Sequence, residues 1–287
     1  MATAAVIGAN GQLGTDVCRH FRVAGWEVHP CDHDRAELTD ADGLRRLVRA
    51  LRPDLVVNTA AMHNVERCEE DPLAAFAVNA VGSRNLALVC AEAGAALIHV
   101  STDYVFDGAK ARPYAEDDPP RPLNVYAASK LAGEFAVLAE CPRAAVVRVS
   151  GLYGHAPCRA KGSLNFVMRM LALARERPEI RVVDDEILTP TRTEDVARQL
   201  VALARTEASG VFHATAQGGC SWYEFAARIL ATTGYGGALH RAAPGEFPAK
   251  VRRPKYTVLD NAALRGLGVD VMPAWQDGLD AYLREAL

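Results

Sequence analysis

Short, mostly apolar runs alternate with longer segments in which apolar residues recur at helical spacing along the first half of the chain. Runs of the first kind predict strands at residues 3–7, 26–31, 54–58, 97–100 and 144–149. Segments of the second kind predict helices, most clearly at 42–51, 74–93 and from 126 onward. Strands without a polar face are typical of a parallel sheet that helices cover on both sides. We therefore expect an α/β fold with a Rossmann-like, doubly wound parallel sheet.

The regular alternation loosens after residue 154. The pattern there predicts helices at 162–175, 193–204 and 222–231 and short strands at 180–183 and 211–214. No repeat, long linker or low-complexity tract sets this part of the sequence apart. We expect residues 1–154 to form the Rossmann domain and residues 155–287 to form mainly a small, interleaved lobe, with some segments returning to the Rossmann core.

The composition is that of a globular protein, with 50% hydrophobic residues, 23% charged residues and a formal net charge of -3. No long basic block points to nucleic acid or to an anionic membrane surface. The cysteines are scattered singly, as in a protein of a reducing compartment. The N-terminal segment lacks a basic stretch and is better explained as a first strand than as a signal peptide. We expect a soluble cytoplasmic protein in which no segment crosses a bilayer.

A glycine-rich turn, GANGQLG, joins the first predicted strand to a helical pattern. In this setting Gly8 allows a tight turn, Gly11 lets a pyrophosphate approach the backbone, and Gly14 lets the helix pack closely on the strand. The glycine spacing alone would also fit an ordinary turn, but its place directly after a strand favours a dinucleotide site. We expect this turn to contact the cofactor through Gly8, Asn10, Gly11, Gln12 and Leu13.

The end of the second predicted strand should meet the adenosine ribose of that cofactor. Asp32 and Asp34 favour the 2′-hydroxyl of NAD, whereas His33 and Arg35 favour the 2′-phosphate of NADP. We assign Asp32 and Arg35 to the cofactor site and leave the choice between NADH and NADPH open. Small residues after the third strand, Ala60 and Ala61, would let a flat cofactor lie across the sheet edge.

A hydroxyl, a phenol and an amine complete the candidate chemistry. Thr102 ends the fourth predicted strand, where ligands bind in doubly wound sheets. Tyr126 and Lys130 lie four residues apart at the start of a predicted helix, so their side chains share one helix face. A positive charge beside a phenol lowers its pKa, and we expect Lys130 to tune Tyr126 in this way. Thr102, Tyr126 and Lys130 are the predicted catalytic residues.

With the motifs GANGQLG, NTAA, STDYVFDG, PLNVYAASKLAGE and VRVSGLYG in this order, the chain resembles the extended short-chain dehydrogenase/reductases. Within them it is similar nearly end to end to the dTDP-4-dehydrorhamnose reductases. The resemblance implies an NADPH- or NADH-dependent oxidoreductase that acts on a nucleotide sugar, with no nucleic acid or membrane partner. Residues 1–154 would bind NAD(P) and residues 155–287 mainly the substrate. Whether the chain forms a homodimer is left open.

The same resemblance implies roles for individual residues. Tyr126 would protonate the C4 oxygen of a 4-keto-6-deoxysugar, dTDP-4-dehydro-L-rhamnose being the first choice. Lys130 would hold the nicotinamide ribose, and Thr102 would hydrogen-bond the ketone. The further residues implied in substrate binding are Asp103, Tyr104, Asn165 and Arg253.

Some positions depart from the family pattern near the substrate. Gly151 stands where the reductases often have a tryptophan, so the identity of the sugar stays open. The segment 250–255 carries four cations, which fit a diphosphate or an ordinary solvated loop about equally well, and the resemblance favours Arg253. Some related reductases place a metal between subunits, and Asp16, Glu194 and Glu285 fall at comparable places. Scattered surface carboxylates explain them equally well, and we predict no metal.

Two alternatives remain at this point. The first is a regulatory subunit, since the β subunit of methionine adenosyltransferase is similar to these reductases, although the intact Thr102, Tyr126 and Lys130 favour an enzyme. A reductase or epimerase of another nucleotide sugar, or a 4,6-dehydratase, is the second alternative. Dehydratases carry a glutamate after the aspartate, and Tyr104 occupies that position here.

Overall fold

The computed structural model describes residues 1–157, 164–243 and 245–286. Its centre is a six-stranded sheet with the order β10-β5-β4-β3-β1-β2, in which every neighbouring pair is parallel. The strands are β1 (Thr3–Ile7), β2 (Glu27–Cys31), β3 (Leu55–Asn58), β4 (Ala96–Thr102), β5 (Ala144–Val149) and β10 (Gly210–His213). The predicted fold class is therefore correct. Pro30, which lacks a backbone donor, lies on the edge strand β2.

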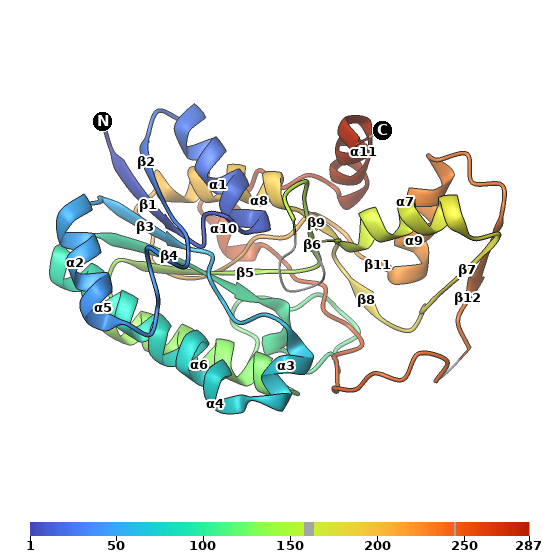
Figure 1. Ribbon diagram of the computed structural model, residues 1–287, viewed down its shortest axis with the longest axis horizontal. Helices are drawn as coiled ribbons and strands as arrows, with labels where there is room; N and C mark the ends of the chain where they lie inside the picture. The colour runs from blue at the N-terminus through green and yellow to red at the C-terminus, as the bar shows by residue number, and fades with distance from the viewer. Residues whose placement is uncertain (158–163, 244, 287) are drawn as a thin grey trace.

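Helices cover both faces of this sheet (Figure 1). One face packs against α1 (Gln12–Val23), α8 (Thr193–Ala204) and the short α10 (Ala262–Gly266). The other face packs against α2 (Ala41–Leu51), α5 (Ser83–Ala93) and α6 (Val125–Glu140). Because both faces are covered, the inner strands β3 and β5 are buried at every residue, whereas the edge strand β2 is partly exposed.

The helix expected at 74–93 is longer and less regular than its pattern suggests. It begins as α4 (Pro72–Phe76), passes through a π-helical segment, Ala77–Gly82, and continues as α5; the short α3 (Val65–Glu70) precedes it. By length and composition alone, Pro72–Ala93 could cross a membrane, contrary to the sequence-based expectation. The apolar composition of this helix is explained by its packing on the sheet, because Leu86, Ala87 and Val89 are buried in the core.

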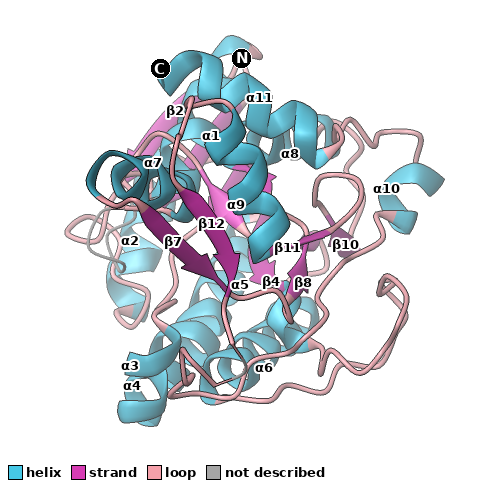
Figure 2. Cartoon of the chain, turned by 90° about the vertical axis from the view of Figure 1, so that its right-hand side faces the viewer, coloured by secondary structure: helices cyan, strands magenta, loops and turns pink. Residues whose placement is uncertain are grey.

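A smaller lobe lies beyond the carboxyl edge of the sheet and has a core of its own (Figure 2). Its helices are α7 (Phe166–Glu176), α9 (Trp222–Ala231) and α11 (Trp275–Ala286). Three two-stranded pairs accompany them: β7 (Glu179–Val182) with β12 (Ala238–Arg241), β8 (Ile187–Leu188) with β11 (Cys220–Ser221), and β6 (Leu152–Tyr153) with β9 (Thr191–Arg192). Both β10 and α8 follow residue 154 but belong to the central layers.

Most predicted elements agree with the structure to within a few residues. The helices at 193–204 and 222–231 and the strand at 144–149 have the predicted bounds. The helix predicted at 162–175 is found at Phe166–Glu176, and residues 158–163 lie outside the part that the structure describes. The pattern did not predict α10, α11 or β12.

Candidate active site

The predicted site residues converge because the sheet is parallel. The glycine turn follows β1, Asp32 follows β2, and Ala60 lies just after β3, while Thr102 is the last residue of β4. Because these strands are parallel, all four positions lie at the same edge of the sheet. The strand order reverses between β1 and β3, and this is where doubly wound sheets bind ligands.

The turn after β1 is built for close approach. Gly8 has φ +79°, and a Cβ there would lie 2.9 Å from the backbone nitrogen of Ala60. A Cβ on Gly14 would lie 2.2 Å from the carbonyl oxygen of Gly8, which explains why α1 can begin so near the strand. Gly11 caps α1 without a side-chain acceptor, so the first amides of the helix face the turn uncapped. Such an N-terminus suits a pyrophosphate, and the turn therefore fits a dinucleotide.

Asp32 and Arg35, the residues predicted to contact the adenosine ribose of the cofactor, both lie at the end of β2. Asp32 accepts a hydrogen bond from the backbone nitrogen of Arg35 at 3.3 Å, which orders the turn. The exposed Arg35 guanidinium donates to the carbonyl oxygen of Pro30 at 3.2 Å. A carboxylate and a guanidinium thus lie at one strand end, as the sequence suggested.

Tyr126 and Thr102 face one another across the site. Asn124 caps α6 by accepting a hydrogen bond from the Ala127 amide at 2.9 Å, and it donates to the carbonyl oxygen of Arg252 at 3.0 Å. Tyr126 follows in the first turn, and its phenol lies near enough to the Thr102 hydroxyl for that group to lower its pKa. Its ring meets the ring of Tyr104 edge to face, with the centroids 6.1 Å apart. The phenol oxygen and the Thr102 hydroxyl are therefore presented together.

The electrostatics of Tyr126 differ from the sequence-based expectation. Desolvation is the main influence, and it raises the pKa of the phenol above its ordinary value, whereas the nearby Thr102 hydroxyl lowers that pKa by a smaller amount. Lys130 is buried, and its Nζ donates to the carbonyl oxygen of Val100 at 2.7 Å. Burial lowers the pKa of this amine to about 8. The expected lowering of the Tyr126 pKa by Lys130 is therefore wrong for this state of the protein, because burial raises that pKa and the side chains that shift it further are Thr102, Asp103, Tyr104 and Cys68.

Asp103 lies beneath Thr102. One carboxylate oxygen accepts from the Thr102 hydroxyl at 3.0 Å, and the other accepts from the Ser150 hydroxyl at 2.7 Å. Burial raises its pKa, and these hydrogen bonds oppose that rise. Both oxygens are thus engaged in holding the end of β4. Contact between Asp103 and a substrate stays a prediction.

Two other predicted binding residues, Gln12 and Asn165, both hydrogen-bond to the backbone of Gly154. The Gln12 amide donates to the carbonyl oxygens of Gly154 and Ala156, at 3.1 Å each. Asn165 donates to the Gly154 carbonyl oxygen at 2.7 Å and caps α7 by accepting from the Met168 amide at 3.0 Å. These side chains join the glycine-turn helix to the smaller lobe, and their contacts with a ligand stay predictions.

The two lysines of the cationic segment 250–255 form ion pairs with other parts of the protein. Lys250 lies 3.6 Å from Glu66, and Lys255 lies 2.8 Å from Asp185. Arg253 lies near enough to Tyr104 to lower the pKa of that phenol against the effect of burial. Its Nε is buried and has no hydrogen-bond partner within the described part of the chain. Arg253 therefore has donor capacity to spare beside Tyr104.

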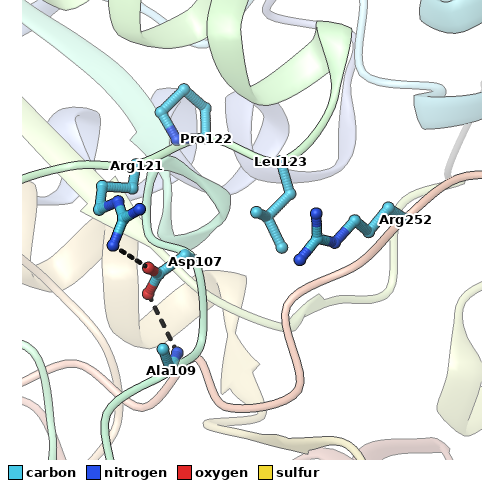
Figure 3. Close-up of a pocket in the computed structure, with 6 residues that line it drawn as sticks. All are labelled: Asp107, Ala109, Arg121, Pro122, Leu123 and Arg252. Atoms are coloured by element: carbon cyan, nitrogen blue, oxygen red, sulfur yellow. Dashed lines mark hydrogen bonds and ion pairs between the residues drawn. The ribbon is translucent and has the colours of Figure 1, made fainter.

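Within the same segment, Arg252 contributes to a cavity of about 440 Å³. Arg252 extends toward Leu123, and Arg121 pairs with Asp107 at 3.4 Å on the other side (Figure 3). The cavity adjoins the start of α6, because Asn124 holds the backbone of Arg252.

The site has no room for the aromatic side chain that related reductases often carry at position 151. A Cβ on Gly151 would lie 2.7 Å from the carbonyl oxygen of Thr189 and 2.9 Å from Leu188 Cδ1. The strand pair β8/β11 and the segment after it therefore fill this space, and the departure noted in the sequence is a structural one.

The three carboxylates considered for a metal belong to an ion-pair network. Arg19 lies 2.9 Å from both Asp16 and Glu194. Arg192 lies 2.8 Å from Glu285 and also pairs with Glu194. Within residues 1–157, 164–243 and 245–286, no group of three His, Cys, Asp or Glu residues is arranged to hold a metal ion.

Comparison with known proteins identifies the family. Residues 2–287 match the family described as RmlD substrate binding domain. The chain belongs to this family. A relative in Streptomyces griseus, a dTDP-4-dehydrorhamnose reductase, is 38% identical and covers 96% of this chain and 90% of its own length. A dTDP-4-keto-6-deoxy-D-glucose reductase of Streptomyces niveus is also 38% identical, with 96% and 94% covered.

The solved structures of the RmlD family give the same result. A dTDP-4-dehydrorhamnose reductase from Bacillus anthracis, in complex with NADP, matches with a TM-score of 0.93 and 35% identity, covering 99% of this chain and 100% of that one. The expected fold class, the resemblance to dTDP-4-dehydrorhamnose reductases and the assignment as a nicotinamide-dependent oxidoreductase are thereby confirmed.

Sequence reasoning missed part of the support beneath the site. Asn58 and His99 are fully buried below the sheet edge, and Ser150 holds Asp103. The available signal was a polar residue inside an otherwise apolar strand, at His99, and at the end of one, at Asn58. A buried polar group requires a partner, so each of these positions predicts a hydrogen bond.

Proposed function

We propose that the protein reduces the C4 ketone of a nucleotide-linked 4-keto-6-deoxysugar, with dTDP-4-dehydro-L-rhamnose as the first candidate substrate. The observation that carries this proposal is the proximity of Thr102 and Tyr126 at the sheet edge that also holds a dinucleotide-type glycine turn. Membership of the RmlD family and the names of the relatives support the same reaction.

Tyr126 is the proton donor in this proposal. Because burial raises its pKa, the phenol is protonated at neutral pH, which is the form that a general acid needs. In this proposal the Thr102 hydroxyl turns its one hydrogen from Asp103 to the ketone oxygen and so keeps that oxygen beside Tyr126. Such donors stabilise the charge that develops on the oxygen during reduction. Asp103 and Ser150 hold Thr102 in place from below.

A bound nicotinamide dinucleotide supplies the hydride. The uncapped N-terminus of α1 and the turn at Gly8 would hold its pyrophosphate, and Lys130 would hold the nicotinamide ribose. The NADP complex of the Bacillus anthracis relative and the exposed Arg35 support NADPH as the preferred form. NADH serves as the comparison in the experiment below.

The nucleotide is assigned to the cationic side of the site. Arg253, with an unpartnered Nε beside Tyr104, is the proposed phosphate ligand, since a guanidinium suits phosphate oxygens. The relatives are named for two 4-keto-6-deoxysugars on the same dTDP carrier. Both sugars belong in the substrate panel, because the closed space at Gly151 changes the wall that the sugar would face.

The test follows nicotinamide absorbance with NADPH or NADH and each dTDP-linked 4-ketosugar. Tyr126→Phe should lower kcat by about 10²–10⁴-fold, the usual contribution of a general acid, and leave the fold intact. Tyr235→Phe, which removes a hydroxyl bonded to the Arg177 carbonyl oxygen in the smaller lobe, is the matched control and should retain turnover. Equal turnover in Tyr126→Phe and wild type would exclude Tyr126 as donor. No turnover by the wild type with any nucleotide-linked ketone would contradict the reductase.

A further inference from the structure

Three buried side chains form a line beneath the proposed active site. Asn58 of β3 and His99 of β4 are neighbours in the sheet register, and Asn58 Nδ2 lies 3.1 Å from His99 Nδ1. On the other side of the ring, His99 Nε2 lies 3.4 Å from Lys130 Nζ, which also donates to the Val100 carbonyl oxygen at 2.7 Å. The three side chains have 0%, 0% and 2% of their surface exposed, so water does not compete for these contacts.

The hydrogen bonds of Asn58 determine which nitrogen of His99 carries the hydrogen. The Asn58 carbonyl oxygen accepts from the Ala60 amide at 3.1 Å, so its NH₂ group is the end that faces His99. His99 Nδ1 must then accept, and in a neutral ring the hydrogen lies on Nε2. Burial and the charge of Lys130 both lower the pKa of His99 well below its ordinary value, which keeps the ring neutral.

The consequence falls on Lys130. If Lys130 is an ammonium, both it and the His99 Nε2–H are hydrogen-bond donors, and neither can accept from the other. The uncharged amine has a lone pair that can accept from His99. The arrangement of Asn58 and His99 therefore disfavours the protonated form of Lys130 beyond what burial alone does. A carbonyl or carboxylate in the place of His99 would have the opposite effect.

We propose that His99 is a positioning residue for the reduction: Asn58 fixes its Nε2–H tautomer, and that N–H opposes the ammonium form of Lys130 while keeping the amine on the Val100 carbonyl. This role rests on the proposed function, in which Lys130 holds the nicotinamide ribose. Lys130 then loses its proton at a lower pH than an exposed lysine, and its ribose contact weakens as the pH rises above that point.

Other charged groups around Lys130 act in the opposite sense or are neutral. Glu134, one turn along α6, favours the ammonium, but its carboxylate is bound by Arg148 of β5 at 2.7 Å and by Ser101 of β4 at 2.5 Å. Tyr126, on the same helix, stays neutral because its pKa is raised. Asn58 on β3 carries no charge. His99 is thus the group whose replacement should change the titration of Lys130 most directly.

The experiment measures the titration of Lys130 in the protein alone, by the ¹³Cε chemical shift of labelled lysine assigned with Lys130→Met. The wild-type midpoint is expected near pH 8. In His99→Gln the amide oxygen can accept from the ammonium, so the midpoint should rise by about one pH unit or more, a tenfold gain in proton affinity. His213→Gln replaces another fully buried histidine, on β10, and should leave the midpoint unchanged. An unchanged or lower midpoint in His99→Gln would overturn the proposal.

A second measurement needs no variant. The ¹⁵N shifts of His99 in the wild type should show a neutral ring with its hydrogen on Nε2, and a hydrogen on Nδ1 would refute the proposal even if His99→Gln fails to fold. Neither readout requires turnover, so the absence of reductase activity would leave this test intact. Where activity is present, the basic limb of kcat/KM should move upward in His99→Gln by the same amount as the Lys130 midpoint.

Discussion

Burial shifts the pKa values of the two titratable groups of the proposed site in opposite directions, and both shifts favour the uncharged form. The pKa of the Tyr126 phenol rises and that of the Lys130 amine falls, so each group moves toward its neutral form. An anionic Tyr126 stabilised by a permanent Lys130 charge, as the spacing suggested, is therefore not the resting state. The protein holds a protonated phenol ready to donate, beside an amine close to its own titration point.

The buried amine has a cost that can be measured as stability. In the unfolded chain Lys130 has its ordinary pKa of 10.5, and in the fold the value is about 8. The unfolded state thus binds more protons between these values, and stability rises with pH from about 8 to 10.5. Below pH 8 the whole penalty, about 3 kcal/mol, applies.

Lys130→Met should therefore stabilise the protein at pH 7 by about 2 kcal/mol, since it removes that penalty and loses one hydrogen bond, to Val100, worth about 1 kcal/mol. The gain should vanish near pH 10, where the remaining penalty is about as large as the lost hydrogen bond, and nicotinamide binding should weaken. Urea unfolding at pH 7 and pH 10 measures both free energies. Lys255→Met, at an exposed ion pair, is the control and should change stability by less than about 1 kcal/mol at either pH. A variant that is less stable than wild type at pH 7 would contradict the assigned burial cost.

Residues with a motif could be predicted from the sequence, and residues with only a packing role could not. Thr102, Tyr126 and Lys130 have a spacing that a helix and a strand end impose. His99 has no such spacing, and within the run LIHV it looks like an interruption of an apolar strand. Its partner Asn58 lies 41 residues earlier, and only the register between β3 and β4 brings the two together.

Among the elements, the junction of β1 and α1 has the tightest steric requirement. At Gly8, φ is +79° and an added Cβ would meet both the Ala60 backbone nitrogen and the Thr59 hydroxyl at 2.9 Å. The end of β3 would have to move away, and with it the turn that we assign to the cofactor. A side chain here is excluded by both the backbone conformation and the neighbouring strand.

We expect Gly8→Ala to weaken NADPH binding by at least about tenfold and to lower stability by about 2–4 kcal/mol, because strain and overlap add. Gly94→Ala is the matched control: its φ is +70°, but nothing lies within 4 Å of the added Cβ. It should cost only about 1 kcal/mol and leave cofactor affinity unchanged. Fluorescence titration with NADPH and urea unfolding separate the two effects. Equal cofactor affinity in Gly8→Ala and wild type would show that the turn does not hold the cofactor.

The order of elements was predictable for strands that are covered by helices on both faces, such as β3 and β5. A short apolar run between two helical segments fits few structures other than a buried parallel strand. The π-helical segment Ala77–Gly82 was not, since an extra residue in a turn leaves no mark on an apolar pattern. Nor was β12, whose residues Ala238–Arg241 are largely exposed and pair only with β7. Such short edge strands depend on a partner that the local sequence does not reveal.

At the scale of the whole molecule, buried charges and rings connect parts of the chain that are far apart in sequence. Arg148 on β5 pairs with Glu134 on α6 and lies over the Phe106 ring, and its Nη1 lies 3.5 Å from His213 on β10. His213 Nδ1 lies 3.1 Å from the carbonyl oxygen of Asp260. A neutral ring that donates from Nδ1 and accepts from Arg148 satisfies both contacts. This network joins the sheet to the segment that returns from the smaller lobe.

Acid should destabilise the fold through the buried His213. Burial and the charge of Arg148 lower the pKa of His213 from its ordinary value near 6.5 to about 3. Below pH 6.5 the unfolded state therefore binds a proton that the native state refuses, and stability falls as the pH falls. The slope for this one group is about 1.4 kcal/mol per pH unit until the pH approaches 3.

His213→Gln should therefore be less stable than wild type at pH 7 by about 1–3 kcal/mol, for the lost contacts, and less sensitive to acid. The difference in unfolding free energy between the two proteins should shrink by about 1.4 kcal/mol for each pH unit between 6 and 4, measured by urea unfolding. His240→Gln, at an exposed position on β12, should follow the wild-type curve throughout. A constant gap between wild type and His213→Gln from pH 7 to pH 4 would mean that His213 takes up its proton in the native state. In that case the contact with Arg148 would have to break within the folded protein.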